Sequence, residues 1–77
     1  MTPYANLSGG SGGVAYSVKA TMISVQFADG RVYDYTYAST GRANVEQMKC
    51  LARAGTGLAT FISQHVQQAY AARHDPD

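Results

Sequence analysis

Three tyrosines at alternate positions are the residues whose type and spacing first suggest a chemistry. Tyr33, Tyr35 and Tyr37 stand in the stretch RVYDYTY. Successive side chains of a strand point to opposite faces, so a strand here would place all three rings on one face. A row of aromatic rings can stack unpaired nucleobases, and it can equally form the floor of a hydrophobic core. The neighbouring turn decides between these two interpretations.

The sequence FADG precedes the tyrosines and allows two turns. A two-residue turn at 29–30 would pair Phe27 with Val32, which places the tyrosines opposite polar residues. A three-residue loop with Gly30 in a left-handed bulge position would instead pair Phe27 with Arg31. We prefer the three-residue loop because it brings the apolar residues of both strands to one face.

In this register Tyr33 lies across from Val25 and Tyr35 lies across from Ile23. We therefore predict that Tyr33 and Tyr35 pack beneath helices, and that Tyr37, at the end of the strand, is an exposed ring. The aromatic residues assigned to the motif and the core are Tyr33, Tyr35, Phe27 and Tyr70.

A second candidate site is a row of basic residues. Lys49 and Arg53 follow Arg42 by seven and eleven positions, which places the three residues on one stripe of a helix. Glu46 lies on the same stretch, between Arg42 and Lys49. Such a stripe is most often a solvated face, and phosphate binding is the alternative. We retain these three residues, together with Tyr37, as the candidate RNA-binding residues.

Other chemistries find little support. His65 falls within an apolar helical stripe, which favours a core histidine, and its spacing from His74 does not suit a metal site. Cys50 has no spaced partner and is interpreted as a small buried residue. Asp34 has no second carboxylate nearby in the sequence and is interpreted as a solvated strand residue. We therefore expect no catalytic, metal-binding or cofactor-binding residues, and no enzymatic activity.

Composition sets further limits. The 77 residues carry a formal net charge of +1. Residues 1–74 hold all six Lys and Arg but only three of the five acidic residues, so this part has a modest basic surplus. The single cysteine cannot form an internal disulfide, which favours the cytoplasm. No apolar run is long enough to span a membrane, so we expect no membrane association.

The pattern along the chain predicts an α+β fold. Residues 1–13, ending in GGSGG, are interpreted as a flexible leader, residues 14–74 as a single domain, and residues 75–77 as an acidic tail. Alternation in VAYSVK, MISVQF and RVYDYTY predicts a three-stranded antiparallel meander. Two C-terminal helices, one capped by Asn44 and one running from Leu58 to the acidic tail, are expected to pack on one face, in the order β-β-β-α-α.

The chain resembles the KTSC domain family, short bacterial domains named after a C-terminal extension of some lysyl-tRNA synthetases. The resemblance covers roughly residues 13–70. It is carried by ISVQFADGRVYDY, with Tyr33-Asp34-Tyr35 as the family's central Y-x-Y, and by a closing helix FISQHVQQAY. The chain lacks the Val-Pro step that commonly follows Y-x-Y in this family. The resemblance implies a domain of unestablished function for which RNA binding is suspected.

We therefore expect a small non-enzymatic interaction module, monomeric or weakly dimeric, that binds structured RNA through a basic helix face. The alternative is a protein-protein adaptor, with the surface around Gln64, Gln67 and Gln68 or an open sheet edge as its interface. Phosphate binding weakens steeply with salt, which separates the two hypotheses.

Overall fold

The structure is a computed structural model that describes residues 2–3, 13–27, 30–66 and 68–75. Four strands come first: β1 (Thr2–Pro3), β2 (Gly13–Lys19), β3 (Met22–Phe27) and β4 (Val32–Thr36). The helices α1 (Tyr37–Thr40), α2 (Arg42–Ala54), α3 (Leu58–Phe61) and the π-helix η1 (Ile62–Val66) follow, and the strand β5 (Ala72–His74) comes last.

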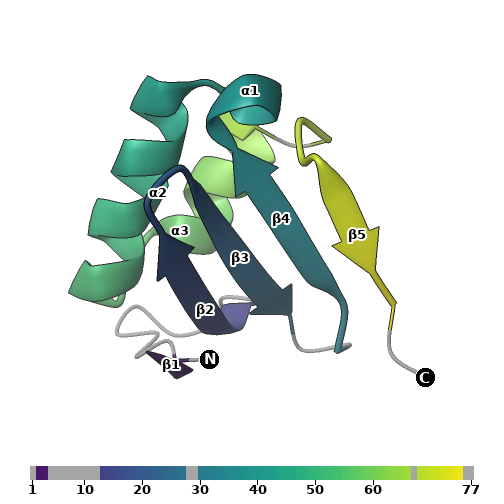
Figure 1. Ribbon diagram of the computed structural model, residues 1–77. Coiled ribbons are helices and arrows are strands. Elements are labelled where there is room, and N and C mark those ends of the chain that lie inside the picture. Colours follow the sequence, from purple (N-terminus) through teal and green to yellow (C-terminus); the bar gives the residue numbers. More distant parts are fainter. Residues whose placement is uncertain (1, 4–12, 28–29, 67, 76–77) are drawn as a thin grey trace.

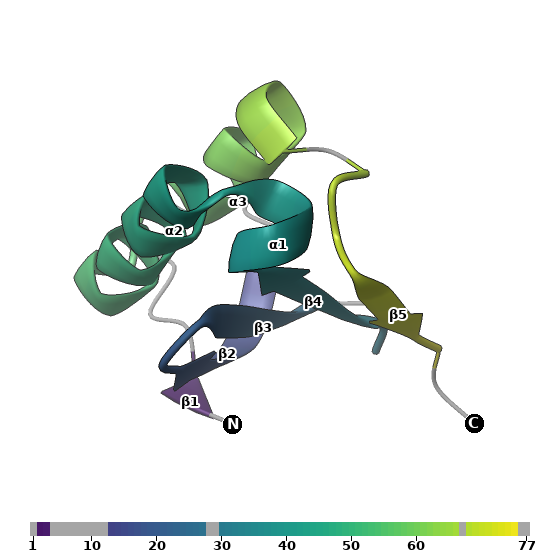
Figure 2. The ribbon, with the colours of Figure 1, turned by 45° about the horizontal axis from the view of Figure 1, so that its top comes forward.

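The architecture is α+β, with one antiparallel sheet in the order β1-β2-β3-β4-β5. The helices gather on one face of this sheet, with α1 above the end of β4 and α2 on the side of β2 (Figures 1 and 2). No described helix covers the opposite face. The meander expected from the sequence forms strands β2, β3 and β4, but the sheet has five strands, because β1 and β5 extend it at its two edges.

The register between β3 and β4 confirms the three-residue loop. Tyr33 pairs with Val25, and Tyr35 pairs with Ile23. The amide of Phe27 donates to the carbonyl of Arg31 at 2.9 Å, and Gly30 has φ 89°, in the left-handed region. The type I turn expected at Ala28 and Asp29 lies outside the described residues. This register turns the apolar face of the hairpin toward the helices.

Local hydrogen bonds explain where the first two helices begin and end. Thr36 caps α1 by a reciprocal arrangement with Ser39, in which the Ser39 amide donates to the Thr36 hydroxyl oxygen at 3.1 Å. Helix α2 begins at Arg42, so the expectation that Asn44 caps it is wrong. The Asn44 side chain instead donates to the Thr40 carbonyl at 3.0 Å. Helix α2 ends at Ala54 and is capped by Gly55, which adopts φ 77°, in the left-handed region.

The core lies between the sheet and the helices. Its fully or nearly fully buried apolar side chains come from β3, β4, α2, α3 and η1: Ile23, Val25, Tyr35, Val45, Met48, Ala52, Leu58, Ile62 and Val66. Tyr33, Phe27 and Tyr70 are half-buried and pack against this cluster. The aromatic row is therefore part of the domain's interior, at its centre for Tyr35 and at its margin for Tyr33.

The prediction of a long second helix that continues to the acidic tail is wrong. The helical segment ends at Val66, and the chain returns to the sheet as β5, which pairs with β4. The Ala71 amide donates to the Asp34 carbonyl at 2.7 Å as the chain joins β4. Strand β5 supplies hydrogen-bond partners to the backbone groups along the edge of β4. A continued helix could not supply them.

Two side chains expected in the core are exposed. His65 lies outside the buried stripe, which Leu58, Ile62 and Val66 form at spacings of four residues. The His65 ring instead lies against that of Phe61, with their centroids 4.7 Å apart. Cys50 is also exposed, because the buried side of α2 is formed by Val45, Met48 and Ala52.

The expected leader and tail fall largely outside the described residues. Of residues 1–13, the described part is Thr2 and Pro3, which pair with β2, and Gly13, the first residue of β2. Of the tail, Asp75 is described, and its carboxylate forms ion pairs with Arg31 and Arg73. No described helix has the length and apolar character needed to cross a membrane.

Candidate nucleic-acid interface

Tyr37 holds a fixed position at the junction of β4 and α1. Its amide donates to the carbonyl of Thr21, in the turn between β2 and β3, at 3.0 Å. Because Thr36 caps α1 and ends the strand, the chain turns here and carries the Tyr37 side chain toward α2. The ring is half-buried. The sequence expectation of an exposed ring at the end of the strand is therefore only partly met.

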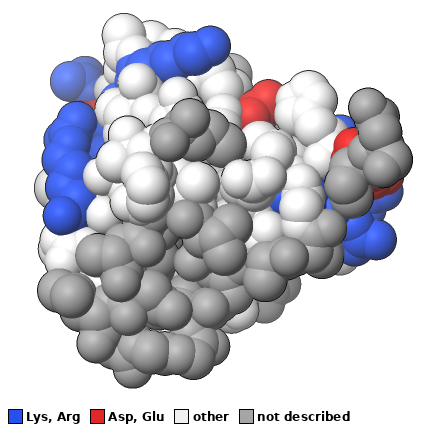
Figure 3. Space-filling view, turned by 90° about the horizontal axis from the view of Figure 1, so that it is seen from below, with Lys and Arg blue, Asp and Glu red and all other residues white. Residues whose placement is uncertain are grey.

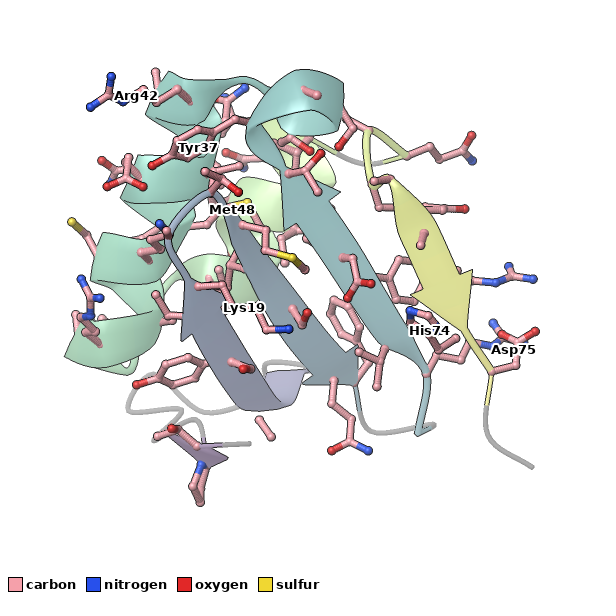
Figure 4. All side chains as sticks on the ribbon, viewed as in Figure 1. Lys19, Tyr37, Arg42, Met48, His74 and Asp75 are labelled. Atoms are coloured by element: carbon pink, nitrogen blue, oxygen red, sulfur yellow. The ribbon has the colours of Figure 1, made fainter. Side chains whose placement is uncertain are left out.

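Two cations lie against the Tyr37 ring. The guanidinium carbon of Arg42 is 5.9 Å from the ring centroid, and the ammonium nitrogen of Lys49 is 5.3 Å from it. Figure 4 shows Tyr37 and Arg42 side by side where α1 meets the start of α2. Both distances are within the range of cation–π attraction. The structure thus brings together Tyr37, Arg42 and Lys49, three of the four residues expected to bind RNA.

Lys49 is not the exposed residue that the helical spacing predicted. It is 5 % exposed, and its ammonium donates to the carbonyl of Ala20 at 3.1 Å. The expected stripe does run along α2, but its middle is covered by Tyr37 and by the turn between β2 and β3. Lys49 therefore connects α2 to this turn, which is a structural role.

Glu46 completes the cluster. Its Oε2 atom lies 2.7 Å from the Lys49 ammonium and accepts a hydrogen bond from the Tyr37 hydroxyl at 2.6 Å. These hydrogen bonds, that of Lys49 first, hold the pKa of the Glu46 carboxyl below its usual value. The bond to Glu46 raises the pKa of Lys49, against the opposing effect of desolvation. We refer to Tyr37, Arg42, Glu46 and Lys49 as the α2 corner.

Arg53 lies in the last turn of α2 and is exposed, as expected. Arg53 follows Arg42 by eleven positions, which corresponds to about 16 Å along the helix axis. The molecule seen from below carries its cationic side chains at separate places, with mostly uncharged described residues between them (Figure 3). The exposed cations of α2 are therefore the two ends of an interrupted stripe, Arg42 and Arg53.

Tyr33, Tyr35 and Tyr70 do not form an open stacking platform. The Tyr33 and Tyr70 rings meet edge to face at 4.8 Å, and Phe27 packs against Tyr33 in the same manner at 5.3 Å. Tyr35 is fully buried, and burial, with the nearby phenols of Tyr33 and Tyr70, raises its pKa above the usual value. These rings contact one another and the core, so they are structural.

A polar cluster joins three strands on the face that the helices leave open. The Ser24 hydroxyl donates to Oδ1 of Asp34 at 2.6 Å, and Nε2 of His74 lies 2.9 Å from Oδ2 of the same carboxylate. Burial disfavours ionisation of Asp34, but these hydrogen bonds and the charges of His74 and Lys19 outweigh it and lower its pKa. Asp34 is thus a connecting residue, and the expectation of a solvated side chain is wrong.

This cluster has no arrangement suited to nucleophilic catalysis. Asp34 lies between the serine and the histidine, whereas a serine nucleophile is activated by a histidine that contacts it directly. Within the described residues, no group of three or more His, Cys, Asp or Glu side chains could hold a metal ion. What the cluster can do is hold β5 against β4.

Sequence reasoning missed the roles of Glu46 and His74. The predicted register places Ser24 opposite Asp34, so that contact could have been read from the pairing of β3 and β4. His74 was expected on a helix, which hid its approach to Asp34. Glu46 was noted on the basic stripe, but nothing in the spacing of α2 indicates that Tyr37 reaches it.

Searches against protein-family models, curated proteins and solved structures found no match to this chain.

Proposed function

We propose that this protein is a small non-enzymatic interaction module of the KTSC type that binds RNA through the α2 corner and Arg53. One observation carries the proposal: the half-buried ring of Tyr37 has two cations of α2, Arg42 and Lys49, against it. The hydrogen bond of the Tyr37 amide to the turn between β2 and β3 holds the ring in place. Nucleic-acid sites combine such rings with positive charge, because the ring stacks on a base while the cation attracts phosphate.

Arg42 and Arg53 are the residues suited to phosphate contact. Both are exposed on the same side of α2, so an extended strand lying along the helix would meet both guanidinium groups. Arginine presents donors in a planar fork that matches phosphate oxygens. The resemblance of the sequence to KTSC domains, for which RNA binding is suspected, supports the same assignment. The absence of an internal disulfide in a chain with one cysteine suits a cytoplasmic module.

Binding of a fluorescent single-stranded oligoribonucleotide at low salt tests the proposal. Two phosphate contacts predict weak binding and a shallow salt dependence, with a log-log slope of about 1 to 2. The variant in which Arg42 and Arg53 are both changed to Gln should lose most of the affinity. The matched control changes Arg31 and Arg73 to Gln, which removes the same charge beside Asp75, and it should bind within about twofold of the parent.

Tyr37 gives a second test of the same site. Changing Tyr37 to Ala should weaken binding of single-stranded RNA by about 1 to 3 kcal/mol, the contribution of one base stacked on an aromatic ring. Absence of RNA association by the parent at low salt would refute the proposal, as would equal binding by the variant lacking Arg42 and Arg53.

A protein-protein adaptor is the second candidate, and the edge strand β5 favours it. No described strand pairs with the outer side of β5, and extended peptides bind to such edges by adding a strand. Gln64 and Gln68 are exposed, whereas Gln67 lies outside the described residues. Capture of partners from lysate with and without nuclease separates the candidates, because a partner held through RNA is lost after nuclease treatment. The module is expected to act as a monomer or a weak homodimer in either case.

A further inference from the structure

The α2 corner contains a positive charge that the chain itself neutralises. The ammonium of Lys49 is enclosed by three groups: the carbonyl of Ala20 at 3.1 Å, the carboxylate of Glu46 at 2.7 Å and the ring of Tyr37. The Lys49 side chain is 7 % exposed, whereas that of Glu46 is 48 % exposed. The carboxylate therefore lies between the buried ammonium and the solvent.

One oxygen atom of the Glu46 carboxylate contacts both Lys49 and Tyr37. Its Oε2 receives the Lys49 ammonium and the Tyr37 hydroxyl, at 2.7 and 2.6 Å, and Arg42 adds its charge from one helical turn away. An ammonium and a hydroxyl bonded to one anionic oxygen, with the charge of a guanidinium nearby, are the groups that bind a phosphate oxygen. Glu46 therefore occupies a position with the chemistry of a phosphate site.

We propose that Tyr37, Arg42 and Lys49 form a phosphate subsite that Glu46 occupies in the free protein, so that a phosphate group of the RNA binds by displacing the Glu46 carboxylate. This inference rests on the proposed function. It assigns Lys49 a role that burial alone would deny it, because rotation of the Glu46 side chain toward solvent opens the ammonium on that side. Glu46 acts as an internal competitor that lowers the affinity of the module.

The test compares three proteins: the parent, Glu46→Gln and the control Asp75→Asn. Both substitutions remove one negative charge, but Asp75 contacts Arg31 and Arg73 instead of the α2 corner. The probe is a 5′-phosphorylated single-stranded oligouridylate of about eight nucleotides, a length within the site sizes of single-stranded binding domains, followed by fluorescence anisotropy. Glu46→Gln should bind about tenfold more tightly than the parent, and its salt slope should be steeper by about 0.7, the value for one more phosphate contact on a single strand. Asp75→Asn should change affinity by less than about twofold.

The outcomes separate the two proposals. Binding by the parent with equal affinities for Glu46→Gln and Asp75→Asn overturns the competitor role and leaves RNA binding standing. Absence of binding by all three proteins overturns the proposed function itself. A second measurement does not depend on the variant folding: RNA titrated into the isotope-labelled parent should shift the amide resonances of Tyr37, Glu46 and Lys49. Shifts confined to other parts of the chain would overturn the inference.

Discussion

The imidazole of His74 approaches the carboxylate of Asp34 at 2.9 Å and joins β5 to the neighbouring strand β4. Strand β5 has three residues, and the Ala71 amide also donates to the Asp34 carbonyl. Asp34 thus binds the returning chain through both its side chain and its backbone. Since its carboxylate is 19 % exposed, the contact is only partly screened by solvent.

This contact predicts an acid-dependent loss of stability. The pKa of Asp34 is lowered from 3.8 in the folded protein, so ionised Asp34 stabilises the fold above that pH, and its contribution is lost as the pH falls through the lowered value. Asp34→Asn should cost about 1.5 to 3 kcal/mol at pH 7, the range for hydrogen bonds to a charged group. Chemical denaturation at pH 7 and near pH 3 measures both effects, and the difference between the two proteins should shrink at the lower pH.

Asp75→Asn serves as the control for Asp34. Asp75 is 54 % exposed in its ion pairs with Arg31 and Arg73, so its removal should cost less than about 1 kcal/mol. Equal losses for Asp34→Asn and Asp75→Asn, or a pH-independent difference between Asp34→Asn and the parent, would contradict the assignment.

The two strand tyrosines should differ in their contribution to stability. Tyr35 is fully buried, so Tyr35→Ala should leave a cavity and cost about 3 to 5 kcal/mol. Tyr33 is half-buried and packs mainly on Phe27 and Tyr70, so Tyr33→Ala should cost less. Urea denaturation monitored by circular dichroism checks the order. A Tyr35→Ala variant as stable as the parent would show that the ring is not a core residue in solution.

The sheet register could be predicted because short-range rules determine it. A one-residue change in the loop would have moved Tyr33 and Tyr35 to the other face, and only one loop length keeps them with Val25 and Ile23. Gly30 is the residue on which this choice depends, since its positive φ accommodates the bulge. Local chemistry and the apolar pattern agree here, so the sequence alone was sufficient.

Gly30 gives a direct test of that reasoning. At φ 89°, a side chain meets its own backbone, so Gly30→Ala should cost about 1 to 2 kcal/mol. Asparagine tolerates left-handed conformations better than alanine does, so Gly30→Asn should cost less than Gly30→Ala. Thermal unfolding of the two variants provides the measurement. Alanine tolerated as well as asparagine would indicate that the loop does not need a left-handed residue at this position.

The C-terminal part of the chain could not be predicted in the same way. Leu58, Ile62 and Val66 follow a helical period, but the period does not show that the helix widens into η1 and ends. Where the chain goes next depends on β4, an edge more than thirty residues earlier in the sequence. The α2 corner also depends on contacts from outside its own helix. Lys49 is buried because of Tyr37 and Ala20, neither of which belongs to α2. Contacts between distant segments override the local pattern in both places.

Lys49 and Arg42 should therefore behave differently when they are neutralised. Lys49→Met removes the bond to the Ala20 carbonyl and leaves Glu46 without its closest cation, so the thermal midpoint should fall. Arg42→Gln removes an exposed charge at the start of α2 and should leave the midpoint nearly unchanged. Differential scanning calorimetry of the two variants, with Arg53→Gln as a second exposed control, measures the contrast. Equal midpoints for Lys49→Met and Arg42→Gln would mean that the ammonium does not hold α2 to the turn between β2 and β3, and an exposed Lys49 could then contact phosphate without any displacement of Glu46.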